Sequence, residues 1–287
     1  MRRRELNPIT LPLLVLLLVF ARPCTAWPAV LSVTVTHPWL ALIASFIGGS
    51  NVEVSSLQEW NAEGELVRPT AKALRALTKD AHIIALDSGD AADAGLKKED
   101  FSNLRCLYAP FPITSSAVDA SLSDPSVLPF VAQRLLTAFS AWDPSNYPYY
   151  QRRLAEFQAR LSGSVLAGQQ VLRGMAVCDL TGTSGALLQA ACCKIERPGP
   201  EQLAELGKSF AVLRDFLNQK REEGVIIVAD GGTPRPLRRA LAGQAGVLFL
   251  QRPPLTQDYP TFLHEQYISL WQTITAKKPV PGGTKHR

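Results

Sequence analysis

A stretch of 26 residues from Tyr147 to Leu172 has the spacing of one long helix. Its apolar or small residues recur every three or four positions, so they share one helical face. These residues are Tyr147, Tyr150, Leu154, Phe157, Leu161, Val165, Gly168 and Leu172. At about 1.5 Å per residue the helix spans about 39 Å, more than the depth of one small domain. We therefore predict that it joins two lobes, although an ordinary helix packed on a single core has the same periodicity.

The residues around this stretch also suggest where the helix begins and ends. Asn146 is a residue type that caps helix starts, and Pro148 is tolerated only in a first turn. Gly174 lies just beyond the expected end, where glycine commonly terminates a helix. The predicted boundaries are therefore Tyr147 and Leu172.

On both sides of this helix, short β-branched runs alternate with helical patterns, as in parallel sheets covered by helices. Before it we expect strands at 30–36, 52–57, 82–87 and 105–109, and helices at 38–47, 70–78 and 127–141. After it we expect strands at 175–179, 225–230 and 247–251, and helices at 184–191, 200–221, 234–241 and 259–274. The predicted fold class is α/β, with an N-terminal lobe at 27–146, a linking helix at 147–172, a C-terminal lobe at 173–276 and a tail at 277–287.

The first 26 residues are typical of a secretory signal peptide. Three arginines at positions 2–4 precede an apolar run at 11–21 that is too short to span a membrane. Small residues before Trp27 favour cleavage after Ala26 and a periplasmic or otherwise exported protein. Lipidation at Cys24 is the alternative, but Arg22 and Pro23 fit a lipoprotein signal poorly.

Most of the positive charge belongs to this segment. Removing its four arginines and one glutamate lowers the formal net charge from +5 to +2. No stripe of basic and aromatic residues remains, so the sequence does not indicate a nucleic-acid surface.

Four cysteines remain after the predicted cleavage: Cys106, Cys178, Cys192 and Cys193. In an oxidising compartment a disulfide from Cys178 to Cys192 or Cys193 is plausible. Buried thiols that behave as small apolar residues are an equal alternative. The spacing does not decide between them.

Four stretches of the chain resemble the solute-binding proteins of zinc- and manganese-type ABC transporters. They are VTVTHPWLALIASFIGGSNVEVSSL at 33–57, RPTAKALRALTKDAHIIAL at 68–86, SDPSVLPFVAQRLLTAFSAWDPSNYPYYQRRLAEFQARL at 123–161, and QDYPTFLHEQYISL at 257–270. The resemblance implies a monomeric, non-enzymatic protein that captures a zinc or manganese ion, or another small solute, and presents it to a membrane permease. The alternative is a metal-free accessory protein that retains the fold.

The resemblance also indicates where metal ligands are expected. The family's four ligand positions fall on Glu65, Ser126, Asp179 or Thr181, and Gln251, and the family's His-rich loop is absent. Only Glu65 and Asp179 offer the charged donors that such metals require. These two are the candidate metal ligands.

The remaining positions carry neutral donors, and each has an ordinary alternative role. Ser126, Thr181, Gln251 and His37 are candidate solute-binding residues. A solvated loop position is the alternative for Glu65, and helix capping is the alternative for Asp179, Ser126 and His37. With so few strong donors, we expect zinc or manganese to bind far more weakly than in the family.

The segment from Asp179 to Gly185 joins a predicted strand to a predicted helix. Its free backbone N–H groups and hydroxyls could hold an anion, although a glycine-rich turn explains it equally well. An enzyme that uses Asp179, Ser184 and His37 is a further alternative, but no motif orders these residues for catalysis.

Overall fold

The computed structural model describes residues 30–109 and 118–276, and its large compact unit begins at Leu31. The predicted signal peptide and the tail at 277–287 lie outside the described residues. No helix within 30–109 and 118–276 combines the length and the apolar character that a membrane span requires.

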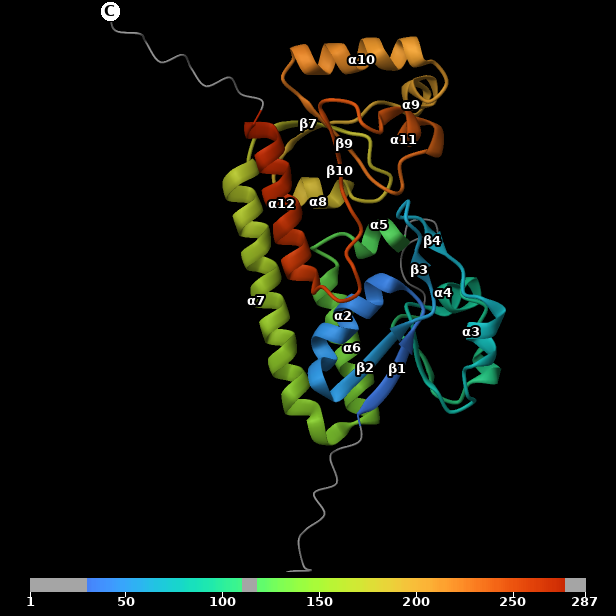
Figure 1. Cartoon of the computed structure of the whole chain (residues 1–287). Helices are drawn as coiled ribbons and strands as arrows, with labels where there is room; N and C mark the ends of the chain where they lie inside the picture. Colours follow the sequence, from blue (N-terminus) through green and yellow to red (C-terminus); the bar gives the residue numbers. More distant parts are fainter. Residues whose placement is uncertain (1–29, 110–117, 277–287) are drawn as a thin grey trace, which may run out of the picture. The chain divides into compact units, whose positions relative to one another are not determined.

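The N-terminal lobe is built on a four-stranded parallel sheet in the order β2-β1-β5-β6 (Figure 1). Its strands are β1 (Leu31–Val35), β2 (Val52–Ser56), β5 (His82–Ala85) and β6 (Leu104–Cys106). Its helices are α2 (Pro38–Gly48), α3 (Ala71–Arg75), α4 (Ser88–Asp93), α5 (Val118–Leu122) and α6 (Leu128–Trp142). A short antiparallel hairpin of β3 (Glu59–Trp60) and β4 (Leu66–Val67) projects from this lobe.

The C-terminal lobe has a second four-stranded parallel sheet, in the order β10-β9-β7-β8. Its strands are β7 (Ala176–Asp179), β8 (Lys194–Glu196), β9 (Ile226–Ala229) and β10 (Val247–Phe249). Its helices are α8 (Gly185–Ala190), α9 (Pro200–Leu206), α10 (Phe210–Glu222), α11 (Arg235–Leu241) and α12 (Tyr259–Thr275).

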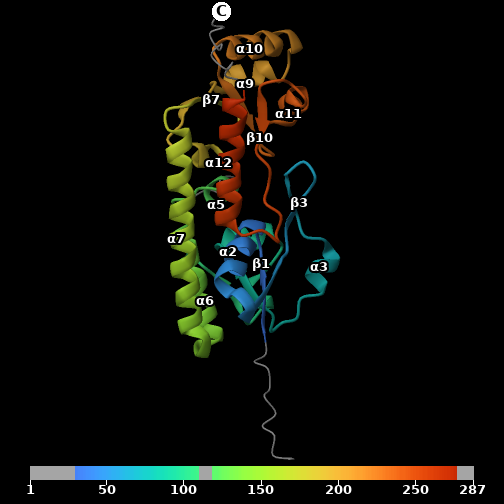
Figure 2. The ribbon, with the colours of Figure 1, turned by 60° about the vertical axis from the view of Figure 1, so that its left-hand side comes forward.

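The long helix α7 (Tyr147–Leu172) has the predicted boundaries and links the two lobes, as predicted. Helix α12 runs beside it in both views (Figures 1 and 2). Gly168 allows this close packing, because a Cβ there would lie 2.4 Å from the ring of Tyr267. The buried face differs from the expected one in two places: Ser164 is buried instead of Val165, and Tyr147 is 41% exposed.

Several local predictions are wrong. The single helix expected at 200–221 is two helices, since the chain leaves α9 at Gly207 and Ser209 caps α10 through its side chain. The Asn146 side chain bonds to Asp143 instead of capping α7. The helix expected at 70–78 ends at Arg75. The β3–β4 hairpin, α4, α5 and β8 were not anticipated.

Candidate functional site

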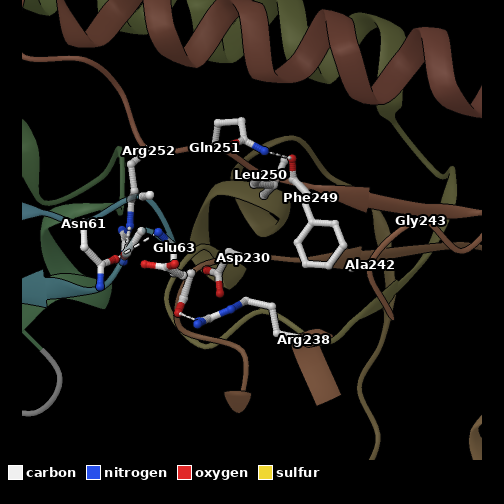
Figure 3. Close-up of a pocket in the computed structure, with 13 residues that line it drawn as sticks. Asn61, Glu63, Asp230, Arg238, Ala242, Gly243, Phe249, Leu250, Gln251 and Arg252 are labelled. Atoms are coloured by element: carbon white, nitrogen blue, oxygen red, sulfur yellow. Dashed lines mark hydrogen bonds between the residues drawn. The ribbon is translucent and has the colours of Figure 1, made fainter. Parts of the chain in front are cut away.

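The candidate site lies where the carboxyl ends of the two parallel sheets face each other. In each sheet the strand order reverses at the centre, between β1 and β5 in one lobe and between β7 and β9 in the other. Such reversal points are where open α/β sheets bind ligands. A pocket of about 420 Å³ opens here between the β3–β4 hairpin and the segments that follow β9 and β10 (Figure 3).

Glu65 lies in the hairpin, and the opposite lobe neutralises its charge. Arg235 donates from Nε to Oε1 at 2.7 Å and from Nη2 to Oε2, while Arg238 donates from Nη2 to Oε1 at 2.9 Å. Hydrogen bonds from Arg235 and then Arg238 hold the pKa of the Glu65 carboxyl well below its usual range. Asn61 folds the tip of the hairpin by accepting hydrogen bonds from the amides of Glu63 and Glu65. Both oxygens of Glu65 are therefore held in ion pairs between the lobes.

A second ion pair crosses between the lobes at Arg252, which follows β10. Its Nε donates to the carbonyl of Gly64 at 3.1 Å, and its Nη2 donates to Asp119 of α5. Its guanidinium carbon lies 5.7 Å from the ring centre of Trp39 and 5.5 Å from that of Trp60. Figure 3 shows Arg252 on the hairpin side of the pocket, beside Asn61.

The two lobes also touch through backbone alone. A Cβ on Gly231 would lie 2.5 Å from the carbonyl oxygen of Gly64, so no side chain fits between them. Gly64 has φ of 76°, a conformation that glycine adopts without strain. Glycine at these two positions therefore permits the close approach of the hairpin to the C-terminal lobe.

Asp179, the second candidate metal ligand, is fully buried and also paired with an arginine. Its Oδ2 accepts from Arg197 Nε at 3.1 Å and from Arg197 Nη2, and its Oδ1 accepts from the amide and hydroxyl of Thr181. The Thr181 hydroxyl is thus directed at Asp179. This arrangement differs from the helix cap that was the alternative for Asp179, since Ser184 occupies the N-cap position of α8.

The turn from Asp179 to Gly185, for which an anion site and a glycine-rich turn were equal alternatives, already holds the carboxylate of Asp230. This buried residue follows β9 and accepts from the amides of Gly182, Thr183 and Ser184, at 2.9, 3.0 and 2.9 Å. Burial alone would raise the pKa of Asp230, but hydrogen bonds from Thr183, Gly182 and Ser184 outweigh burial and lower it. The Ser184 hydroxyl also donates to Asp230, at 2.8 Å.

The remaining predicted site residues are dispersed. Gln251 lines the pocket, and its amide donates to the carbonyl of Phe249. Ser126 is exposed, its amide donates to Asp124, and Val127 takes the N-cap position of α6. Within residues 30–109 and 118–276, no hydrogen bond joins Glu65, Ser126, Asp179 and Gln251 to one another.

His37 caps α2, which was the alternative to a solute-binding role. Its Nδ1 accepts from the amide of Trp39 at 3.2 Å, so the neutral ring carries its proton on Nε2. Burial lowers the pKa of His37 to about 4, although nearby Asp119 raises it and Arg252 lowers it further. Nε2 lies 3.9 Å from Asp119 and has no hydrogen-bond partner.

The four described cysteines are free thiols. Cys178 packs into the core between β7, β9 and α10, whereas Cys193 packs against the larger core that contains α7 and α12. Because these cores lie on different faces of the sheet, the two side chains do not meet. Burial raises the pKa of Cys178 to about 12, which disfavours the thiolate that a metal would require.

The donor set does not fit a zinc or manganese ion. In the part of the chain that the structure describes, no three His, Cys, Asp or Glu side chains form a group able to hold a metal. The sequence reasoning missed the arginines that neutralise the two carboxylates. Arg235 and Arg238 are three residues apart on α11, a spacing that places both on one helical face and could have indicated a carboxylate partner.

Comparisons with known proteins agree with this architecture. Neither the family models nor the curated protein sequences gave a match. Among solved structures, ZnuA covers 85% of this chain with a TM-score of 0.63 at 17% identity, and 99% of ZnuA is matched. The fold is that of the metal-type periplasmic solute-binding proteins.

Two further structures share this fold. The laminin-binding protein Lmb of Streptococcus agalactiae, described as an adhesin with metal-transporting activity, covers 85% of this chain and 99% of its own at 17% identity, with a TM-score of 0.62. FpvC from Pseudomonas aeruginosa was solved with Mn²⁺. The match covers 86% of this chain and 99% of FpvC at 14% identity, with a TM-score of 0.59. At these low sequence identities, the comparisons show a shared fold and nothing more.

Proposed function

We propose that this protein is an exported, monomeric, non-enzymatic solute-binding protein of an ABC transporter, with a small organic solute as its cargo instead of a bare zinc or manganese ion. It binds the solute between its lobes, near Gln251 and the pocket beside Arg238 and Arg252, and presents it to a membrane permease. The metal-type solute-binding fold supports the first part of this proposal.

The pairing of Glu65 with Arg235 and Arg238 carries the second part. A dication needs several negative or imidazole donors that converge on one point. Here the carboxylate at the family's first ligand position is neutralised by two guanidinium groups, which also repel a dication. Asp179 is paired in the same way with Arg197. The charge distribution favours a ligand that is held by hydrogen bonds and ring faces.

Calorimetric titration with zinc and manganese chloride tests this proposal. We expect no binding tighter than about micromolar in the wild type, whether oxidised or reduced. One equivalent of zinc bound below micromolar, and lost in both Glu65→Ala and Asp179→Ala, would show that the two carboxylates suffice and that the proposal is wrong.

Native mass spectrometry of the gently purified protein gives the second readout. We expect a small organic molecule to co-purify and to be lost on denaturation. A protein that carries no such molecule and also binds no metal would contradict cargo transport and favour the metal-free accessory role.

A further inference from the structure

Aromatic rings, a carboxylate and a carbonyl surround the guanidinium of Arg252, as they would surround a bound cationic ligand. Two indole rings flank it, those of Trp39 and Trp60, which lie 5.0 Å apart in an edge-to-face arrangement. Ring faces of tryptophan attract cations, and planar guanidinium also stacks on them. Asp119 supplies the opposite charge, and the carbonyl of Gly64 accepts a hydrogen bond. We refer to Trp39, Trp60, Asp119 and the Gly64 carbonyl as the tryptophan box.

The N-terminal lobe supplies the four groups of the tryptophan box, and the C-terminal lobe supplies Arg252. Tyr259 and Phe262 of α12 also pack against the ring of Trp39, at 5.5 and 6.0 Å between ring centres. The box is also organised from within its own lobe. Trp39 Nε1 donates to Asp119 Oδ1 at 2.7 Å, which leaves Oδ2 directed at the guanidinium. Trp39 is 2% exposed and belongs to α2, whose residues other than Ser45 are buried. Trp39 and Asp119 are therefore positioned by each other and by the core of their own lobe.

Unpartnered polar atoms are concentrated at this place. Five buried side-chain nitrogen or oxygen atoms of the described residues lack a hydrogen bond. Three belong to the box or touch it: Trp60 Nε1, His37 Nε2 and Arg252 Nη1; a fourth, Gln58 Oε1, lies two residues before Trp60. The Arg252 side chain is only 10% exposed. A buried ion pair that serves stability alone normally has all its polar atoms satisfied.

We propose that the tryptophan box is the binding site for a guanidinium-bearing solute, and that Arg252 occupies it as a tethered competitor. This inference rests on the proposed function and names the chemical class of the cargo. The solute enters when the Arg252 side chain leaves the box, since Arg252 and Gly64 both line the neighbouring pocket. The pocket of about 420 Å³ borders both Gly64 and Arg252, so it offers room for the rest of the solute.

The chemistry of the box favours guanidinium over other cations. A metal ion needs several oxygen or nitrogen donors, whereas the box offers one carboxylate, one carbonyl and two ring faces. A compact ammonium ion is strongly hydrated and cannot stack, but guanidinium is planar and weakly hydrated. The acceptor Gln58 Oε1 suits a cation with five N–H donors.

A tethered competitor has a measurable consequence. A group linked to its own site acts at an effective concentration in the millimolar range, so a free solute must displace it. Removing the arginine side chain should therefore tighten binding of a free guanidinium compound by about tenfold or more. The tryptophans of the box provide an intrinsic fluorescence signal for this measurement.

The test titrates methylguanidinium into the mature protein at constant ionic strength and follows tryptophan fluorescence and the thermal unfolding midpoint. We expect saturable binding in Arg252→Ala, binding at least about tenfold weaker in the wild type, and none when Asp119→Asn is added. Arg239→Ala is the matched control, since Arg239 is an exposed arginine of α11. It should behave as the wild type.

Arg252→Gln, which keeps most of the side chain's length, replaces the alanine variant if that variant does not fold. A folded Arg252 variant that shows no saturable binding would overturn the proposal, as would equal affinity in the wild type and the variant. Butylammonium binding as tightly as methylguanidinium would overturn the assigned class. None of these outcomes changes the metal titration, so a failure here is distinguishable from a failure of the proposed function.

Discussion

The carboxylate of Asp230 accepts hydrogen bonds from both the amide and the hydroxyl of Ser184, at 2.9 and 2.8 Å. The same carboxylate binds the amides of Gly182, Thr183 and Gly232, so it connects the loops that follow β7 and β9. In this fold the turn after the first strand of the second lobe is thus stabilised by an internal anion. It is a structural element and not a binding site for an external anion.

We expect Asp230→Ala to lower the free energy of unfolding by about 3 kcal/mol at pH 7, because several buried N–H groups lose their acceptor. The lowered pKa of Asp230 means that its stabilisation is complete above the ordinary carboxyl pKa, about 3.9, and is lost as the pH falls through the lower folded-state value. The difference in the free energy of unfolding between Asp230→Ala and the wild type should therefore become smaller below about pH 4.

Denaturant unfolding at pH 7 and at pH 3 measures both effects. Asp215→Ala is the control, since Asp215 is an exposed aspartate that pairs with its neighbour Arg214. Equal losses for the two variants would contradict the role assigned to Asp230.

Two glycines of α7 should respond in opposite directions to alanine. Gly168→Ala places a methyl group 2.4 Å from the ring of Tyr267. It should lower the free energy of unfolding by about 1–3 kcal/mol, because α7 and α12 must move apart. Gly163→Ala meets no atom within 4 Å and should stabilise the helix by about 0.5–1 kcal/mol. Thermal unfolding of both variants checks this prediction, and a loss of stability in Gly163→Ala would contradict it.

The cysteines should differ in reactivity. Cys106 and Cys192 are exposed, although partial burial raises the pKa of Cys106, while burial raises the pKa of Cys178 to about 12 and that of Cys193 to about 11. A thiol reagent at pH 8 should therefore modify Cys106 and Cys192 quickly and the other two only after unfolding. Peptide mapping by mass spectrometry identifies the modified residues. A disulfide at Cys178 in the non-reduced map would show that the free-thiol arrangement is wrong.

The architecture was largely predictable because its determinants are local and periodic. The long helix α7 has the predicted boundaries, since 26 residues of helical periodicity, with a proline in the first turn and a glycine just beyond the end, leave little freedom. The predicted strands match the observed ones within two residues at either end, as shown by β1 and β7, except that β6 ends at Cys106, three residues before the predicted end. The two short helices α9 and α10 were merged, because the break at Gly207 does not interrupt the apolar pattern.

The candidate site was less predictable, because its contacts join residues far apart in the chain. Glu65 was identified as a candidate, but its partner Arg235 lies 170 residues away, and no periodicity connects them. Asp230 was not identified as a site residue, because nothing local indicates that its carboxylate would enter the turn at 182–184. Charges that neutralise a site are visible only after folding brings them together.

The backbone contact between Gly64 and Gly231 has a mechanical consequence. Because no side chain separates these residues, the main chains of the two lobes are in direct contact here and the lobes cannot come closer at this point. Side chains of increasing size at position 231 would act as spacers of increasing thickness, since even one Cβ would lie 2.5 Å from the Gly64 oxygen. Such a series of substitutions would increase the distance between the hairpin and the C-terminal lobe step by step, so this distance could be set by the choice of residue at position 231.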